Sequence, residues 1–176
     1  SEGKYEKVII EQEPPISPIG VAPTLRSHRV GLGLYDLTDA GLIRREFIAV
    51  DVTGAHTEIA ELVGKQQPDL LLVNDGDLTF AKVRLDKKSW KTATAQLGAI
   101  SDSLARAVIW SAAWDMTRDA EVSTGEFLDL VLAGIDRETD VGVTSGVLRQ
   151  LSMAIDQFAA PEHRDAYRLR VAQACE

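Results

Sequence analysis

Three histidines are the side chains of this chain that could most directly bind a metal ion or move a proton. His28, His56 and His163 lie far apart in the sequence. None belongs to an H-E-x-x-H segment, in which two histidines one helical turn apart hold zinc. The segment His56-Thr57-Glu58 resembles a metal site only superficially. We therefore expect the histidines to be surface residues or hydrogen-bonded structural residues, not ligands.

Two neighbouring carboxylates, Asp75 and Asp77, could act as a pair or bind calcium. The loop around them lacks the twelve-residue pattern and the terminal bidentate Glu of an EF-hand. In Asn74-Asp75-Gly76-Asp77, the Asn and Asp side chains can cap nearby backbone amides, and Gly76 can adopt a positive φ. This composition predicts a structural turn, bonded to local backbone amides or to neighbouring helices.

A glycine pair offers a second binding motif. Gly31 and Gly33, within GLGLYD, could cradle a phosphate if a helix followed them. No helical pattern follows, so the segment fails that structural requirement. We expect these glycines to belong to a strand.

Two tryptophans could form a platform for a sugar. Trp110 and Trp114 are one helical turn apart within an apolar segment. Aromatic residues at this spacing usually pack in a core. We therefore expect both rings to be core residues.

A weaker enzymatic hypothesis combines Ser111, Asp115 and a distant histidine in an autonomous hydrolase. The sequence around Ser111 contains neither a nucleophile elbow nor an oxyanion signature. We accordingly assign no catalytic, cofactor-binding or metal-ligating residue to this chain from its sequence.

The charge of the chain argues against nucleic acid as a partner. Its net charge of -8 and pI near 4.9 disfavour binding to phosphates, which requires clustered Lys and Arg. Basic runs such as Lys87-Lys88 and Arg44-Arg45 are short. The hydrophobic content of 45% is enough to fill a core.

Cysteine usage and hydropathy favour a cytoplasmic protein. The single cysteine, Cys175, cannot form an internal disulfide, which fits a reducing compartment. No apolar run approaches the roughly 20 residues that span a bilayer, and the polar start SEGKYEK does not resemble a signal peptide. We therefore expect no membrane contact.

Up to Asp86, apolar residues recur at every second position, as in half-buried strands. Gly31 and Gly33 leave one face of their strand bare, which indicates a close approach of another backbone or a bulge. A proline-rich segment, residues 13–23, is expected to be an extended crossing loop. The predicted strands, which together form a small antiparallel β-sandwich, are residues 5–12, 29–35, 42–52, 58–63, 70–73 and 79–85.

After Asp86 the period becomes helical, and short links predict antiparallel neighbours stacked as in an α-solenoid. The last helix lacks a polar capping repeat, so we expect a truncated solenoid that self-associates through an exposed apolar side. The side chains predicted on that side are Tyr167, Leu169 and Val171. The predicted helix starts are Ser89, Ser101, the capping box Ser123 and Glu126, Thr144 or Ser145, and Pro161.

These patterns predict an α+β protein in two domains. Residues 1–86 form an antiparallel β-sandwich, and residues 87–176 form the start of a domain of stacked antiparallel helices. The predicted β-to-α boundary lies between Val83 and Trp90, because the strand alternation ends at Leu85 and Ser89 is the first good helix cap.

Three segments resemble the region after the catalytic domain in zinc aminopeptidases of the aminopeptidase N family, particularly its actinobacterial forms. They are RSHRVGLGLYDLTDAGLIRREFIAVDVTG, NDGDLTFAKVRLD and RAVIWSAAWDMTRDAE. The resemblance implies that the first part is the family's β-sandwich and that the remainder begins its large helical domain. In this family the helical domain limits substrate access, and the sandwich links it to the catalytic domain.

The family's catalytic motifs, G-A-M-E-N and H-E-x-x-H with a distant Glu, are absent from this sequence. The resemblance therefore implies a non-catalytic fragment of an enzyme that removes N-terminal amino acids from peptides, with zinc bound outside this chain. The implied partners are the catalytic domain of the same polypeptide and the peptide substrates of the parent enzyme. The alternative is an independent β-sandwich module that binds a protein or carbohydrate.

Overall fold

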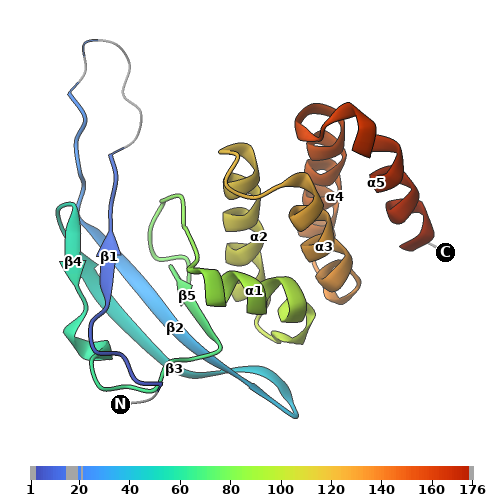
Figure 1. Ribbon diagram of the computed structural model, residues 1–176. Coiled ribbons are helices and arrows are strands. Elements are labelled where there is room, and N and C mark those ends of the chain that lie inside the picture. Colours follow the sequence, from blue (N-terminus) through green and yellow to red (C-terminus); the bar gives the residue numbers. More distant parts are fainter. Residues whose placement is uncertain (1–2, 15–19, 21, 175–176) are drawn as a thin grey trace.

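The computed structural model describes residues 3–14, 20 and 22–174, and these form strands followed by helices (Figure 1). This order confirms the predicted α+β fold class. The strands are β1 (Ile9–Glu11), β2 (His28–Thr38), β3 (Gly41–Val52), β4 (His56–Glu58) and β5 (Leu70–Val73). The α-helices are α1 (Lys87–Gln96), α2 (Ser103–Arg118), α3 (Thr124–Gly134), α4 (Val141–Met153) and α5 (Pro161–Ala174).

The strands form two antiparallel sheets that share a hydrophobic core. One sheet has the order β3-β2-β5, and the other pairs β1 with β4. Ile10 of β1 packs against this core, and Ile48 of β3 packs there beside buried Val50 and Val52. The buried residues of this core are Val30, Leu32, Leu34, Val50, Val52, Ile59 and Leu62.

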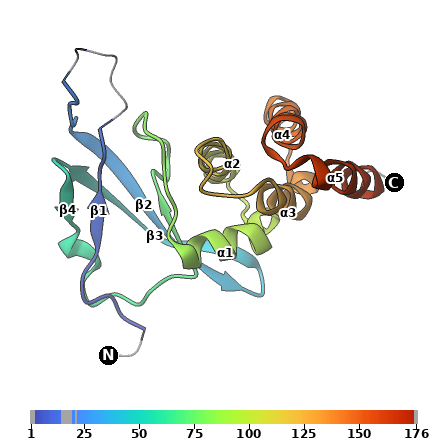
Figure 2. The same cartoon turned by 45° about the horizontal axis from the view of Figure 1, so that its top comes forward.

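Strand β5 is covered on both faces, as its continuous apolar run predicts. Leu70 and Leu72 are buried in a second core that they share with the helices. Leu71 and Val73 pack against the core between the sheets. The three-stranded sheet is therefore a middle layer, with the small sheet on one side and the helices on the other (Figures 1 and 2).

Two predicted strands are wrong. Residues 58–63 contribute only Glu58 to β4, and the chain then turns into a short 3-10 helix, Ala60–Leu62, that buries Leu62. Residues 79–85 are irregular: Val83 and Leu85 are buried, but Ala81 is exposed and the segment pairs with no strand of the described residues. The alternation of apolar residues there comes from an extended segment that packs against the helices and is not hydrogen-bonded into a sheet. Most of the predicted crossing loop, residues 13–23, lies outside the described residues.

The N-caps of three helices differ from the prediction. Ser89, Ser101 and the pair Thr144 or Ser145 were each expected to start a helix, but a nearby aspartate does so in each case. A carboxylate caps well because it accepts from the free amides and also suits the positive end of the helix dipole. The observed caps are Asp86, Asp102 and Asp140, whereas the capping box of Ser123 and Glu126 and the start at Pro161 are confirmed.

Ser89 instead ties the helices to the sheet. Its hydroxyl donates to Asp86 Oδ2 at 2.5 Å and accepts from the backbone amide of Leu71 in β5 at 2.9 Å. Helix α1 begins at Lys87, within the predicted interval between Val83 and Trp90.

Helix α3 lies at the centre of the helical part and contacts α1, α2, α4 and α5 (Figure 2). Trp110 is buried, and the ring of Trp114 lies 5.9 Å from that of Phe127 and 6.0 Å from that of Phe158. Both tryptophans are therefore core residues, as predicted.

The predicted apolar side of α5 is wrong for two of its three residues. Tyr167 and Val171 are half-buried and pack against the helical core, while Leu169 is exposed. Helix α5 thus turns most of its apolar surface inward, against α3 and the chain after α4.

Candidate functional site

A cluster of charged and polar side chains lies where the three-stranded sheet meets the start of α2. Its centre is Asp75, whose side chain is completely buried. The hydroxyl of Tyr35 donates to Asp75 Oδ1 at 3.1 Å, and Arg44 Nη1 donates to Oδ2 at 3.0 Å. Arg44 Nη1 also lies 3.7 Å from Asp102 Oδ2, at the N-terminus of α2. We call these four residues, Tyr35, Arg44, Asp75 and Asp102, the junction cluster.

The two glycines of β2 make room for Asp75. A Cβ on Gly31 would lie 2.0 Å from the backbone oxygen of Asp75, and a Cβ on Gly33 would lie 2.2 Å from its Oδ2. The amide of Asp75 also donates to the carbonyl of Gly31 at 3.0 Å. The register of the β2–β3 pair shifts between Leu34 and Tyr35. The glycines predicted either a close backbone approach or a bulge, and the close approach is confirmed at Gly31.

The turn after β5 holds Asp75 in place. Asn74, Gly76 and Asp77 have φ values of 62°, 80° and 52°. Asn74 is buried, and its side chain bonds the backbone of Thr79 twice, donating at 2.9 Å and accepting at 3.1 Å. The predicted structural role of the turn is therefore confirmed for Asn74. For Asp75 the predicted partners are wrong, because its carboxylate binds side chains of β2 and β3.

We predict that Asn74→Ala lowers the free energy of unfolding by about 0.5–2 kcal/mol, by analogy with a lost cap. The substitution removes both bonds to Thr79 and places alanine at a positive φ. Urea unfolding measures the loss. Asn74→Gly is the matched comparison, since glycine tolerates the backbone and loses only the hydrogen bonds. Wild-type stability in both variants would contradict a structural turn.

The charges of the junction cluster suit a structural contact between the sheet and α2, not proton transfer. Burial, and then the nearby Asp75 carboxylate, raise the pKa of Tyr35 far above its ordinary value, so the phenol stays protonated. The hydrogen bond to Asp75 raises the pKa of Arg44, so the guanidinium stays charged. Neither side chain can exchange a proton near neutral pH. The cluster connects the sheet to α2 and does not form an acid–base pair.

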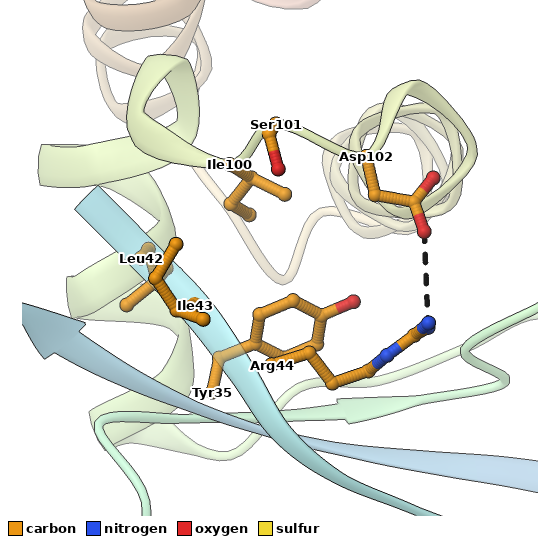
Figure 3. Close-up of a pocket in the computed structure, with 7 residues that line it drawn as sticks. All are labelled: Tyr35, Leu42, Ile43, Arg44, Ile100, Ser101 and Asp102. Atoms are coloured by element: carbon orange, nitrogen blue, oxygen red, sulfur yellow. Dashed lines mark ion pairs between the residues drawn. The ribbon is translucent and has the colours of Figure 1, made fainter. Parts of the chain in front are cut away.

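A cavity of about 220 Å³ lies beside the junction cluster (Figure 3). The sheet forms one wall, and the connection between α1 and α2 forms the other. The ion pair of Arg44 and Asp102 crosses from one wall to the other. The lining residues are Tyr35, Leu42, Ile43, Arg44, Ile100, Ser101 and Asp102.

A second charged cluster is buried within the helices, and the sequence analysis missed it. Arg106 Nη2 lies 2.8 Å from Glu138 Oε1, and the two side chains are only 5% and 1% exposed. Trp110 Nε1 donates to Glu138 Oε2 at 3.1 Å, and Arg106 Nη1 donates to the carbonyl of Ile100 at 2.8 Å. The available signal was Arg106 itself, which lies four residues before Trp110 on the same helical face.

The structure does not bring the three histidines together. His28 Nδ1 lies 2.6 Å from Thr79 Oγ1, His56 is an exposed residue of β4, and the ring of His163 lies 6.0 Å from that of Tyr167. Within the described part of the chain, no group of three or more His, Cys, Asp or Glu side chains could hold a metal ion. Cys175 lies outside that part.

The residues of the hydrolase hypothesis are also dispersed. Ser111 is an exposed residue of α2, and Asp115 follows it on the same helix. The histidines belong to β2, β4 and α5.

No helix among residues 3–14, 20 and 22–174 is long and apolar enough to cross a membrane.

This chain is similar to a known family and to a known protein. Residues 70–176 match the family of ERAP1-like C-terminal domains. The chain is also 48% identical over 177 residues to a protein of Streptomyces lividans named "Aminopeptidase N". That match covers 99% of this chain and 21% of the relative, so the chain spans about a fifth of the relative's length. The two matches confirm the resemblance drawn from the sequence.

Proposed function

The chain belongs to the family of ERAP1-like C-terminal domains, and from this premise we propose that it is a non-catalytic part of a zinc aminopeptidase. Such an enzyme removes N-terminal amino acids from peptides. In this proposal, residues 1–86 are the sandwich that links to the catalytic domain, and residues 87–176 begin the helical domain that limits access of peptides. The extent of the match to the Streptomyces lividans protein carries the proposal.

The packing of the chain supports a role in positioning one domain against another. The sheet and the helices share one hydrophobic core, to which Tyr35 and Leu42 contribute from the sheet and Phe127 from the helices. The junction cluster adds an ion pair from Arg44 of β3 to the buried Asp75 carboxylate, and a partly exposed ion pair from Arg44 to Asp102 at the N-terminus of α2. A close-packed core has low compressibility, so the shared core keeps the helices in a defined orientation to the sheet.

Zinc does not fit the described residues of this chain, because their histidines and carboxylates are dispersed. In the proposed enzyme the metal is bound by the catalytic domain of the same polypeptide, whose substrates are peptides.

The proposed compartment is the cytoplasm.

We predict that the isolated chain binds no stoichiometric zinc and releases no amino acid from aminoacyl substrates. The expectation follows from the missing H-E-x-x-H spacing. Metal analysis after chelation and reconstitution, together with an aminoacyl-anilide assay, measures both properties. One tightly bound zinc per chain would contradict the proposal.

A chimera tests whether this chain can serve as the non-catalytic part of a zinc aminopeptidase. This chain replaces the matching fifth of the Streptomyces lividans protein, and hydrolysis is measured with a short aminoacyl-anilide and with longer peptides. We expect the chimera to hydrolyse the short substrate as the parent does and to keep the parent's ratio of long to short substrate. Loss of hydrolysis in a folded chimera would overturn the proposal. Glycan or protein capture by the isolated chain would favour the binding module instead.

A further inference from the structure

One large apolar side chain of this structure is entirely exposed. Phe80 has a relative exposure of 103%, although it lies in an ordered connection between β5 and α1. Leu78, two residues earlier, is 48% exposed, and Phe47 of β3 is 43% exposed. Leu78 and Phe80 belong to one short segment, and exposed large apolar residues that occur together commonly mark an interaction surface.

The backbone next to Phe80 is held firmly. The backbone carbonyl of Thr79 accepts from the buried Asn74 side chain, its amide donates to the same side chain, and its hydroxyl lies 2.6 Å from His28 Nδ1. On the other side, Lys82 binds Asp119 at 2.8 Å. The segment that carries Phe80 is therefore tied to the fold on both sides, which lowers the entropic cost of ordering this segment when it binds a partner.

Phe47 and Leu78 lie on one continuous surface. A Cβ built on Gly76 would lie 3.6 Å from Phe47 Cε2 and 3.9 Å from Leu78 Cδ2, so both side chains flank this glycine. The Arg44 guanidinium lies 5.6 Å from the centroid of the Phe47 ring. The charge at the edge of this surface is thus already paired, since Arg44 binds the buried Asp75.

We propose that Phe80, with Leu78 and Phe47, is the apolar anchor by which this region docks against the remainder of a longer polypeptide. The inference rests on the proposed function, in which that remainder contains the catalytic domain. We call these three residues the Phe80 anchor.

The size of the Phe80 anchor favours a partner in the same polypeptide over a second copy. Three half-exposed or exposed side chains offer a few hundred Å² at most, whereas stable interfaces between separate proteins bury about 1,200–2,000 Å² in total. A small contact suffices within one polypeptide, where linkage raises the effective concentration to about the millimolar range. The relative matched over 99% of this chain holds the equivalent region within a protein about five times as long.

Cross-linking in the chimera with the Streptomyces lividans protein tests the docking. A photoreactive benzoylphenylalanine replaces Phe80, and the cross-linked peptides are mapped by mass spectrometry. We expect cross-links within one molecule to residues outside the segment that this chain replaces. Cross-links between two molecules would identify a second copy as the partner and overturn the inference, as would the absence of any cross-link. This readout does not depend on activity.

The variant Phe80→Ala gives a second, independent measurement. In the isolated chain it should leave the thermal midpoint unchanged, because the ring is exposed there. In the chimera it should speed cleavage between the two parts by limited proteolysis about tenfold, as expected for loss of an interface anchor. Leu169→Ala, at an exposed residue of α5, is the matched control and should change neither property.

The two proposals fail in different ways. A chimera that keeps Phe80 but does not hydrolyse aminoacyl substrates contradicts the proposed function, while its cross-links still report on docking. An active chimera in which Phe80→Ala is cleaved as slowly as its parent contradicts only the docking inference.

Discussion

Replacing Arg106 by Met is expected to lower the free energy of unfolding by about 3–5 kcal/mol. The substitution leaves the Glu138 carboxylate buried without its cation, since Glu138 is only 1% exposed. Glu138 would keep the indole of Trp110 and the backbone amide of Thr139 as donors, but neither carries a charge. Breaking a buried pair costs more than the pair contributes, because the remaining charge is neither solvated nor neutralised. Urea unfolding measures the change.

The matched control is Arg168→Met, which breaks an exposed pair with Asp156 at 2.7 Å. Exposed pairs contribute about 0–1 kcal/mol, so this variant should unfold nearly as the wild type does. A double variant that replaces both Arg106 and Glu138 by apolar residues should recover much of the loss. Equal stability of Arg106→Met and Arg168→Met would contradict the buried pair.

The same pair makes stability depend on pH in the acid range. The hydrogen bond from Arg106, opposed by burial, holds the pKa of Glu138 below its ordinary value near 4.5. A carboxylate with a lowered folded-state pKa contributes stability above its unfolded pKa and loses it as the pH falls through the folded value. The wild type should therefore lose stability below about pH 4.5 more steeply than the apolar double variant.

A methyl group at Gly31 is expected to destabilise the chain by about 3 kcal/mol or more, the upper end of the cost of overpacking. The Cβ of Gly31→Ala would lie 2.0 Å from the backbone oxygen of Asp75, and that oxygen belongs to a turn held by buried bonds. Either the turn or β2 must move, which weakens the bonds of Asp75 to Tyr35 and Arg44. Thermal and urea unfolding measure the effect.

Gly146→Ala in α4 is the control for this substitution. No atom lies within 4 Å of its added Cβ, and alanine favours a helix over glycine by roughly 0.5–1 kcal/mol. This variant should be as stable as the wild type or more so. A Gly31→Ala protein with an unchanged midpoint would show that Asp75 does not depend on the space above Gly31.

The signals that predicted the fold correctly are local. Alternation identified β2 and β3, a short apolar run identified β5, and the spacing of Ser123 and Glu126 identified the start of α3. The glycines of β2 indicated a close backbone approach because a missing side chain leaves space that must be filled. Each of these features depends on residues within a few positions, so the sequence alone determines them.

Local sequence patterns gave the wrong element boundary where two nearby residues fitted the same pattern. Asp86, Asp102 and Asp140 cap helices that serine or threonine residues nearby could also have started. The alternating segment 79–85 has the pattern of a strand, but it packs against helices and pairs its Lys82 and Arg84 with residues beyond α2. Its pattern records burial, which does not specify the partner.

Only the tertiary structure decided which distant residues meet. Asp75 binds Tyr35 and Arg44 across 40 and 31 residues, and Arg106 binds Glu138 across 32. No spacing rule connects residues so far apart, because their meeting depends on how the sheet and helices pack. Burial then requires such pairs, because a charge removed from water is costly unless an opposite charge or a hydrogen-bond partner lies beside it. The sequence determined the elements of this protein, and their packing determined its ionic clusters and the exposure of Phe80.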